Sequence, residues 1–226
     1  GGSIHPTPTI KVLEDNPASA LLDGDCGLGH LVGFHAMNIA IEKARAASIG
    51  MAVVRNSHHF GAASSHAMRA LAHDMIGFAT TNGPGVNMAV FGAMSPSIGN
   101  NAFAYAIPAG EEPPIVLDMA CGAAAAGRIG TAGMYNEKIP IGWGLDANGE
   151  DTDDPSKVSV ILPAAGPKGS ALAIVMDVLC GPLSGGLMGI NKRFAPADEP
   201  LEKRATAHFF LAIHIASLTS VEAFKA

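Results

Sequence analysis

Apolar and polar positions along the chain follow two periods, one typical of strands and one typical of helices. Short apolar runs predict strands at 51–54, 76–81, 102–107, 115–117 and 208–213. Helical spacing or small-residue runs predict helices at 34–44, 62–73, 170–179 and 221–225. The strand at 115–117 and the helix at 170–179 are apolar on nearly all sides, so both are expected to be buried.

The segment 51–62 joins a predicted strand to a predicted helix through a polar elbow that contains His59. Ligands of open α/β sheets bind outside the carboxyl ends of the strands, so His59 is expected at a ligand site. The strand–helix–strand order over 51–81 predicts a parallel pair with a right-handed crossover. The loops 56–61 and 82–85 would then be neighbours and form two walls of one cleft.

A glycine-rich segment comes before this elbow, with Gly27, Gly29 and Gly33 around His30. Its spacing does not match the dinucleotide-binding fingerprint, and no strong strand leads directly into it. We therefore reject a Rossmann interpretation. The helix that follows, from Phe34 on, is expected to end at a stop signal, Gly50.

Composition excludes several classes of protein. Charged residues are only 15% and hydrophobic residues 48% of the 226 residues, which indicates a folded chain with a substantial core. A net charge of −6 without a basic stretch argues against nucleic-acid binding. No apolar run reaches the length of a membrane helix, so no membrane partner is expected. The three widely separated cysteines are typical of free thiols in a reducing cytoplasm.

His59 is the first candidate for chemistry. A neutral imidazole at a strand-to-helix elbow can take or give a proton near pH 7. The alternative is that His59 caps the helix or is a buried structural histidine. We assign a structural role of this kind to its neighbour, His58. A metal site on the two adjacent histidines is disfavoured, because no nearby cysteine or carboxylate completes a ligand set.

Lys168 and Asp118 also stand at unusual places. Lys168 lies in the first turn of a predicted helix, where a cation opposes the helix dipole unless an anionic ligand binds there. The alternative is a solvated lysine that points away from the helix. Asp118 closes an apolar strand and either accepts hydrogen bonds from ribose hydroxyls or caps the following helix. Asn82, Asn100 and Asn101 are candidates for ligand contacts or for turns.

Together these residues form an ordered set of motifs that resembles the malate/L-lactate dehydrogenase family of NAD(P)-dependent oxidoreductases, which includes sulfolactate and ureidoglycolate dehydrogenases and piperideine-2-carboxylate reductases. The matching segments are D-G-x-x-G-x-G-H at 23–30, N-S-x-H-x-G at 56–61, L-G-x-N at 98–101, L-D-M-A at 117–120, L-P-x-x-G-x-K-G at 162–169 and G-P-L-S-G at 181–185.

The resemblance implies an α/β fold with a layered, mixed and partly parallel sheet, flanking helices and a non-Rossmann NAD(P) site. It implies a homodimer that interconverts a small 2-oxo acid and its 2-hydroxy acid, with NAD or NADP as cofactor. His59 would be the catalytic acid and base, oriented by Ser57 and Asn56, and Arg55 and Asn101 would bind substrate. The residues expected to hold the cofactor are Asn82, Gly83, Asp118, Met119, Ala120, Gly166, Pro167, Lys168 and Gly169.

The chain also departs from the family pattern. The family's Ser-His-Gly and arginine constellation is not found, so 1–226 is expected to be one oxidoreductase domain that lacks terminal parts. Its ends, 1–20 and 205–226, would belong to an incomplete second subdomain, and 187–204 is loop-like with a possible join. A non-catalytic nucleotide-binding protein and a metal-dependent hydrolase remain alternatives. The substrate and the choice between NAD and NADP stay open.

Overall fold

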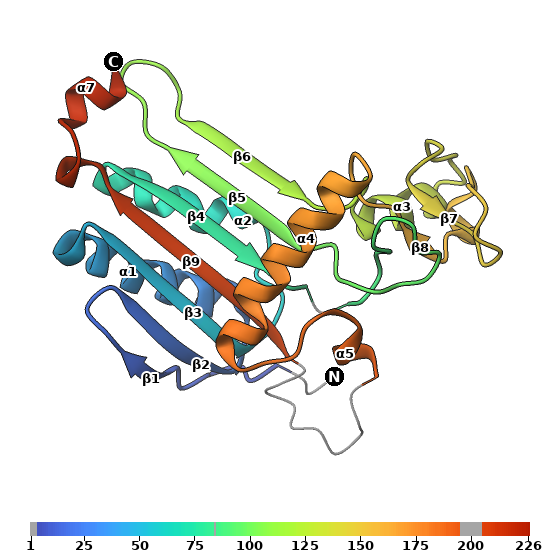
Figure 1. The fold of residues 1–226 in the computed structure, drawn as a ribbon, viewed down its shortest axis with the longest axis horizontal. Coiled ribbons are helices and arrows are strands. Elements are labelled where there is room, and N and C mark those ends of the chain that lie inside the picture. The colour runs from blue at the N-terminus through green and yellow to red at the C-terminus, as the bar shows by residue number, and fades with distance from the viewer. Residues whose placement is uncertain (1–3, 84, 195–204) are drawn as a thin grey trace.

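The computed structural model describes residues 4–83, 85–194 and 205–226. Within them, a seven-stranded sheet runs in the order β1-β2-β3-β9-β4-β5-β6, and β2 with β3 is its one parallel pair (Figure 1). This mixed sheet confirms the predicted α/β class and differs from the parallel sheet of a Rossmann fold. The strands are β1 Lys11–Asp15, β2 Ser19–Gly27, β3 Ile49–Ser57, β4 Met75–Thr81, β5 Ala102–Ile107, β6 Ile115–Ala120 and β9 Thr206–His214.

Helices cover both faces of this sheet, with α1 and α2 behind it and α4 crossing in front (Figure 1). The predicted helix at 62–73 is an α-helical turn that tightens into a 3₁₀ helix. The helices are α1 Gly29–Ala47, α2 Ala63–Ala67, η1 Met68–His73, α3 Ala126–Met134, η2 Pro155–Lys157, α4 Pro167–Cys180, η3 Pro182–Ser184, α5 Gly189–Arg193, η4 Ile215–Ser217 and α7 Val221–Lys225.

The sheet separates two hydrophobic cores. Val54 and Phe210 belong to the core on the α1 side, whereas the adjacent residues Val53 and Phe209 belong to the core on the α4 side. Successive side chains of a strand point to opposite faces, so a strand covered on both faces needs a continuous apolar run. This explains why β3 and β9 lack the alternation that is typical of half-exposed strands.

β2, α1 and β3 form a strand–helix–strand unit with parallel strands. The expectation that no strand leads into the glycine-rich segment is therefore wrong, because β2 ends at Gly27 and α1 begins at Gly29. A Cβ on Gly29 would lie 2.1 Å from the His58 carbonyl oxygen, so this glycine serves close packing. Gly50 is not the helix stop: left-handed Ser48 (φ 70°) follows the helix, and Gly50 lies within β3.

The predicted parallel pairing of β3 with β4 is also wrong in one respect. β9 lies between them and is antiparallel to both. Two strands that are each antiparallel to a third run in the same direction, so the carboxyl ends of β3 and β4 still meet one edge of the sheet. Residues 205–226, expected in a second subdomain, thus supply a central strand of the main sheet, and β1 extends the same sheet at its margin.

Two segments expected to be buried are exposed. β6 is the edge strand, with Ile115 at 65% exposure, and α4 leaves Ile174, Val175 and Val178 at 41–52% exposure. The opposite face of α4 carries Ala173 and Met176 into the core. Both elements are apolar on faces that the described residues do not cover.

The segment 121–165 forms a small lobe beside the sheet, seen to the right in Figure 1. It contains α3 and the two-stranded sheet of β7 Gly144–Leu145 and β8 Val160–Ile161. In 187–204, the segment expected to contain a join, α5 occupies the start of the predicted loop, and 195–204 lie outside the described residues. None of the described helices is both long and apolar enough to span a membrane.

Candidate functional site

A cleft of about 380 Å³ opens at the edge where β3, β4 and β6 end. It brings together the two loops predicted to be neighbours, the end of β6 and the first turn of α3. Its lining residues are His59, Gly61, Thr81, Gly83, Gly85, Asn87, Asn100, Ala102, Ala120, Ala125, Ala126 and Gly127. The prediction that the two loops form walls of one cleft is confirmed.

His59 is the exposed imidazole of this cleft. The Gly61 amide donates a hydrogen bond to its Nδ1 over 3.1 Å. A neutral imidazole that accepts at Nδ1 carries its proton on Nε2, so this contact assigns the tautomer. Gly61 has φ +78° and lies against the His30 ring, so the elbow needs glycine there.

Asn56 and Arg55 are tied to β2 instead of lining the cleft. Asn56 has φ 54°; its Nδ2 donates to Asp23 Oδ1 over 2.9 Å, and Cys26 Sγ donates to its Oδ1 over 2.9 Å. Arg55 Nε pairs with Asp23 Oδ2 at 3.4 Å. Asp23 therefore anchors the backbone that leads into the elbow.

Ser57 is fully buried, and its hydroxyl contacts a histidine that we did not single out as a site residue. His208 of β9 has Nε2 at 3.0 Å from Ser57 Oγ and Nδ1 at 2.9 Å from Thr81 Oγ1. The ring is 0% exposed and stacks on Phe60 at 4.7 Å between centroids. A histidine inside an otherwise apolar strand was the one sequence signal for it.

A second buried histidine, His66 of α2, stacks on the same Phe60 ring at 4.7 Å. Its Nε2 lies 2.8 Å from the Phe60 carbonyl oxygen. Burial lowers the pKa of His66 to about 4 and the pKa of His208 to about 3, because a charged imidazole loses hydration in the interior. Both rings are therefore neutral near pH 7.

Asn82 and Asn101 are also buried and used inside the fold. Asn82 Oδ1 accepts from the Ala207 amide over 2.8 Å, which ties the second wall to β9. Lys192 of α5, in a segment predicted as a loop, donates to the Asn82 carbonyl oxygen over 3.2 Å. Asn101 Nδ2 donates to the Ala173 carbonyl over 2.8 Å and so anchors α4.

Asp118 caps a helix, but not the one that follows it in sequence. Its Oδ2 accepts from the Ser64 amide over 2.8 Å, in the first turn of α2. Further along β6, Met119 packs against the core on the α4 side and Ala120 lines the cleft. The strand thus reaches the cleft through its last residue.

The Gly166–Gly169 turn lies next to the end of β6. The Ala164 amide donates to the Cys121 carbonyl over 2.9 Å, and a Cβ on Gly169 would lie 2.5 Å from that oxygen. Ala165 and Gly166 both have positive φ, at 51° and 61°. Pro167 then starts α4 and leaves Lys168 exposed. A second cavity of about 500 Å³ adjoins Gly166 and is lined by largely apolar residues, among them Phe91, Met94 and Leu162.

Comparison with known proteins decides the family. A sequence model described as malate/L-lactate dehydrogenase matches residues 1–226. The chain belongs to this family. It is 37% identical to a malate dehydrogenase of Pyrococcus abyssi, over 99% of this chain and 63% of that protein. It is 37% identical to an L-sulfolactate dehydrogenase of Methanocaldococcus jannaschii, over 99% of this chain and 64% of that protein.

The fold has the same relatives. The crystal structure of malate dehydrogenase from Entamoeba histolytica superposes with a TM-score of 0.91 at 27% identity, covering 99% of this chain and 65% of that one. The chain thus spans a little under two thirds of the length of these members of the malate/L-lactate dehydrogenase family.

Dehydrogenases of the malate/L-lactate dehydrogenase family use nicotinamide cofactors, and the cleft fits such a group. Asn87 Oδ1 is buried there without a partner among the described residues, and a carboxamide NH₂ would satisfy it. A Cβ on Gly83, Gly85 or Gly127 would meet no heavy atom within 4 Å, so these walls leave room. The first turn of α3 has no side-chain cap and presents backbone N–H groups suited to phosphate.

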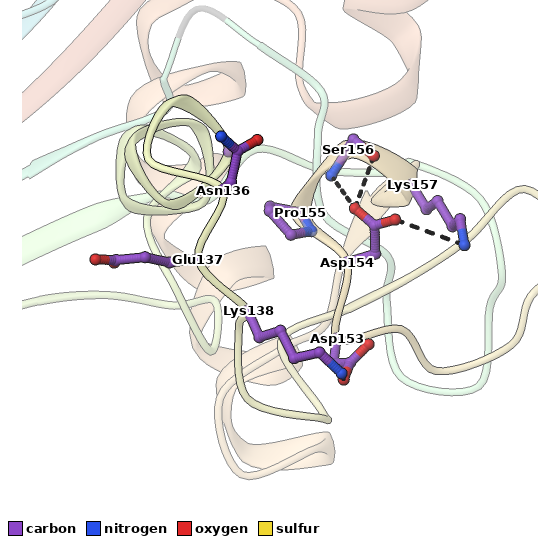
Figure 2. Close-up of a pocket in the computed structure, with 9 residues that line it drawn as sticks. Asn136, Glu137, Lys138, Asp153, Asp154, Pro155, Ser156 and Lys157 are labelled. Atoms are coloured by element: carbon purple, nitrogen blue, oxygen red, sulfur yellow. Dashed lines mark hydrogen bonds and ion pairs between the residues drawn. The ribbon is translucent and has the colours of Figure 1, made fainter.

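A further hollow of about 390 Å³ lies at the other end of α3 (Figure 2). There Asp154 accepts hydrogen bonds from Ser156 and pairs with Lys157 at 3.5 Å, while Lys138 pairs with Asp153 at 2.6 Å. These charges satisfy one another, so nothing there indicates a ligand. No group of three or more His, Cys, Asp or Glu side chains arranged for a metal occurs among the described residues.

The buried histidines predict how stability depends on pH. The pKa of His66 and of His208 is lower in the folded chain than the ordinary 6.5, so the unfolded chain binds more protons between about pH 6.5 and 4. The free energy of unfolding should therefore fall on acidification, by up to about 1.4 kcal/mol per pH unit for each ring. Urea unfolding at several pH values in this window measures the slope.

The matched variants are His66→Phe and His35→Phe. The first removes one of the two neutral buried rings and should reduce the slope, whereas exposed His35 on α1 should leave it unchanged. An identical slope in His66→Phe and the unaltered chain would contradict the assignment.

Proposed function

We propose that the protein is an NAD(P)-dependent oxidoreductase that interconverts a small 2-oxo acid and its 2-hydroxy acid. The observation that carries the proposal is His59, exposed in a cleft whose other walls fit a nicotinamide dinucleotide. When bound, the cofactor supplies or accepts the hydride at the C2 carbon. The residues of the chain bind, orient and move the proton.

His59 acts on the substrate oxygen. In the resting tautomer Nε2–H donates a hydrogen bond to the carbonyl oxygen of a 2-oxo acid. Proton delivery from Nε2 needs the imidazolium, in which Nδ1 is protonated and can no longer accept from Gly61. In the oxidation direction Nε2 must accept the hydroxyl proton, which requires the other tautomer, with the ring proton on Nδ1. The ring therefore releases Gly61 during the reaction, and the elbow must permit that movement.

Asn82, Gly83 and the end of β6 would hold the cofactor along the cleft. Ala120 would line its floor, and Asp118 and Met119 precede it on β6. One carboxylate oxygen of Asp118 accepts from Ser64, which leaves the other for a ribose hydroxyl. The turn Gly166–Gly169 presents Lys168 to a phosphate group.

Arg55 is assigned the contact with the substrate carboxylate, and Asn101, also expected to bind substrate, is assigned a supporting role. Arg55 is half-buried, its Nε pairs with Asp23, and its Nη1 lies 3.8 Å from where a Cβ on Gly185 would stand. Its Nη groups are the part of the side chain that binds a carboxylate. The amide of Asn101 already serves the Ala173 carbonyl, so its contribution is to hold α4 beside the site.

Other members of the family act on ureidoglycolate or on cyclic imines, and these are the alternative substrate classes. A non-catalytic nucleotide-binding protein is the alternative from another class. Oxidation of NADH and NADPH, followed at 340 nm with pyruvate, oxaloacetate, sulfopyruvate and a cyclic imine, separates them. Tight NADH binding without turnover across this panel favours the binding protein.

Removal of the acid and base gives the first test. His59→Ala should lower kcat by about 10²–10⁴-fold, the usual contribution of general acid–base catalysis, and leave the Kd for NADH nearly unchanged. Steady-state kinetics and fluorescence titration measure the two quantities. His35→Ala, another exposed histidine, is the matched control and should retain full activity. Normal turnover by His59→Ala would exclude His59 as the acid and base.

A second test concerns Lys168. Lys168→Gln should weaken the Kd for the dinucleotide and reduce the salt dependence of binding, because a charge facing phosphate is lost. Lys157→Gln, an exposed lysine on the separate lobe, should change neither. Titrations at low and high ionic strength compare the variants. Equal affinities of Lys168→Gln and the unaltered protein would remove Lys168 from the cofactor site.

We also propose that the protein is a homodimer and that α4 lies in the interface. The apolar side chains of Ile174, Val175 and Val178 are exposed on one face of this helix. An exposed apolar face of this kind is typical of a protein–protein interface. Val175→Glu should shift the molecular mass measured by light scattering from dimer to monomer. Met134→Glu alters an exposed apolar residue on α3 and should leave the dimer intact. A monomeric unaltered protein would refute the proposal.

A further inference from the structure

A single imidazole joins the two walls of the cleft from behind. Ser57 is the last residue of β3, immediately before the loop with His59, and Thr81 is the last residue of β4, immediately before Asn82 and Gly83. His208 contacts both hydroxyls, at 3.0 and 2.9 Å.

The Thr81 hydroxyl favours one direction for the hydrogen bonds of this bridge. The Thr81 hydroxyl donates to the Ala207 carbonyl over 3.2 Å, so its oxygen is free to accept from His208 Nδ1–H. In that tautomer the neutral ring accepts a hydrogen bond from the Ser57 hydroxyl at Nε2. Burial holds the pKa of His208 at about 3, so this pattern of donors and acceptors persists across neutral pH.

Packing restricts the ring further. The imidazole stacks on Phe60, the residue after His59, with 4° between the ring planes. Phe60 is 1% exposed, so the backbone next to His59 cannot shift without disturbing the ring behind it. The bridge thus controls one wall through Ser57 and Phe60 and the other through Thr81.

We propose that His208 is a positioning residue that sets the separation between His59 and the Asn82–Gly83 wall. The kinetic part of this proposal rests on the proposed function, because that separation fixes the distance between proton donor and cofactor. The structural part does not depend on any ligand. A misplacement of reacting groups by about 1 Å can cost about 10²-fold in rate, so a bridge of this kind is worth a measurable factor.

The decisive variant is His208→Phe, which keeps a flat ring against Phe60 and removes both hydrogen bonds. His66→Phe is the matched control, because His66 is equally buried, stacks on the same Phe60 and touches neither hydroxyl. His208→Gln is the conservative variant, since an amide can donate to one hydroxyl and accept from the other.

Amide hydrogen exchange of the protein without cofactor or substrate tests the bridge directly. His208→Phe should accelerate exchange in both 58–61 and 82–85, whereas His66→Phe should leave 82–85 unchanged. Unchanged exchange at 82–85 in a folded His208→Phe protein would overturn the proposal. Should His208→Phe fail to fold, Thr81→Val removes the Nδ1 contact and the Thr81 bond to the Ala207 carbonyl but keeps the Ser57 contact, and it should loosen 82–85. Unchanged exchange there would equally overturn the proposal.

Kinetics then test the consequence. His208→Phe should lower kcat by about 10–10²-fold with little change in KM, and His208→Gln should restore much of the loss. His66→Phe should keep kcat, whatever its effect on stability. Equal kcat losses in His66→Phe and His208→Phe would mean that both act only through stability. If exchange responds as expected while the unaltered protein shows no turnover, the bridge stands and the proposed function fails.

Discussion

β9 pairs on both edges, with β3 on one side and β4 on the other, and the rest of the fold depends on that pairing. Its register places His208 opposite Val54 and opposite Thr81, while Phe209 lies opposite Val53 and Thr80. A slip of one residue would turn every side chain of β9 to the other face of the sheet. His208 would leave the Ser57 and Thr81 hydroxyls, and Phe209 and Phe210 would exchange cores. The register of this one strand in its two ladders therefore fixes both cores and the back of the cleft.

The sequence could predict what is encoded locally. The elbow around His59, the strand at 102–107 and the helix at 221–225 follow from apolar runs and turn residues a few positions apart, and each is found where expected. The juxtaposition of the two loops was also correct, although β3 and β4 do not pair. It survives because β9, antiparallel to both, preserves their common direction. The placement of β9 between β3 and β4 pairs residues more than 120 positions apart in the sequence, and no local pattern predicts it.

Polar residues near the cleft were harder to interpret, because a polar side chain can serve a ligand or the fold. The side chains of Ser57, Asn82 and Asn101 all form hydrogen bonds inside the fold. Their partners are His208, Ala207 and Ala173, respectively. A buried polar group without a partner is costly, so such residues are used internally wherever the backbone offers a donor or acceptor. Asn82 Nδ2 and Asn101 Oδ1 are nevertheless buried without a partner among the described residues, as is Asn87 Oδ1, which lines the cleft with His59. No local pattern in the sequence distinguishes Asn87 from the other asparagines.

The helix α4 shows where a burial pattern can mislead. An apolar residue at nearly every position means that the helix meets apolar surroundings on more than one side; it does not mean that the same chain provides them. Ala173 and Met176 face the sheet, whereas Val175 and Val178 face outward, like Ile115 and Leu117 on the edge strand β6. Water contact with several large apolar side chains on one surface is unfavourable by roughly 25 cal/mol per Å². The pattern that looked like a core helix is therefore equally the pattern of a helix shared between two bodies, and the two cannot be told apart before the sheet is in place.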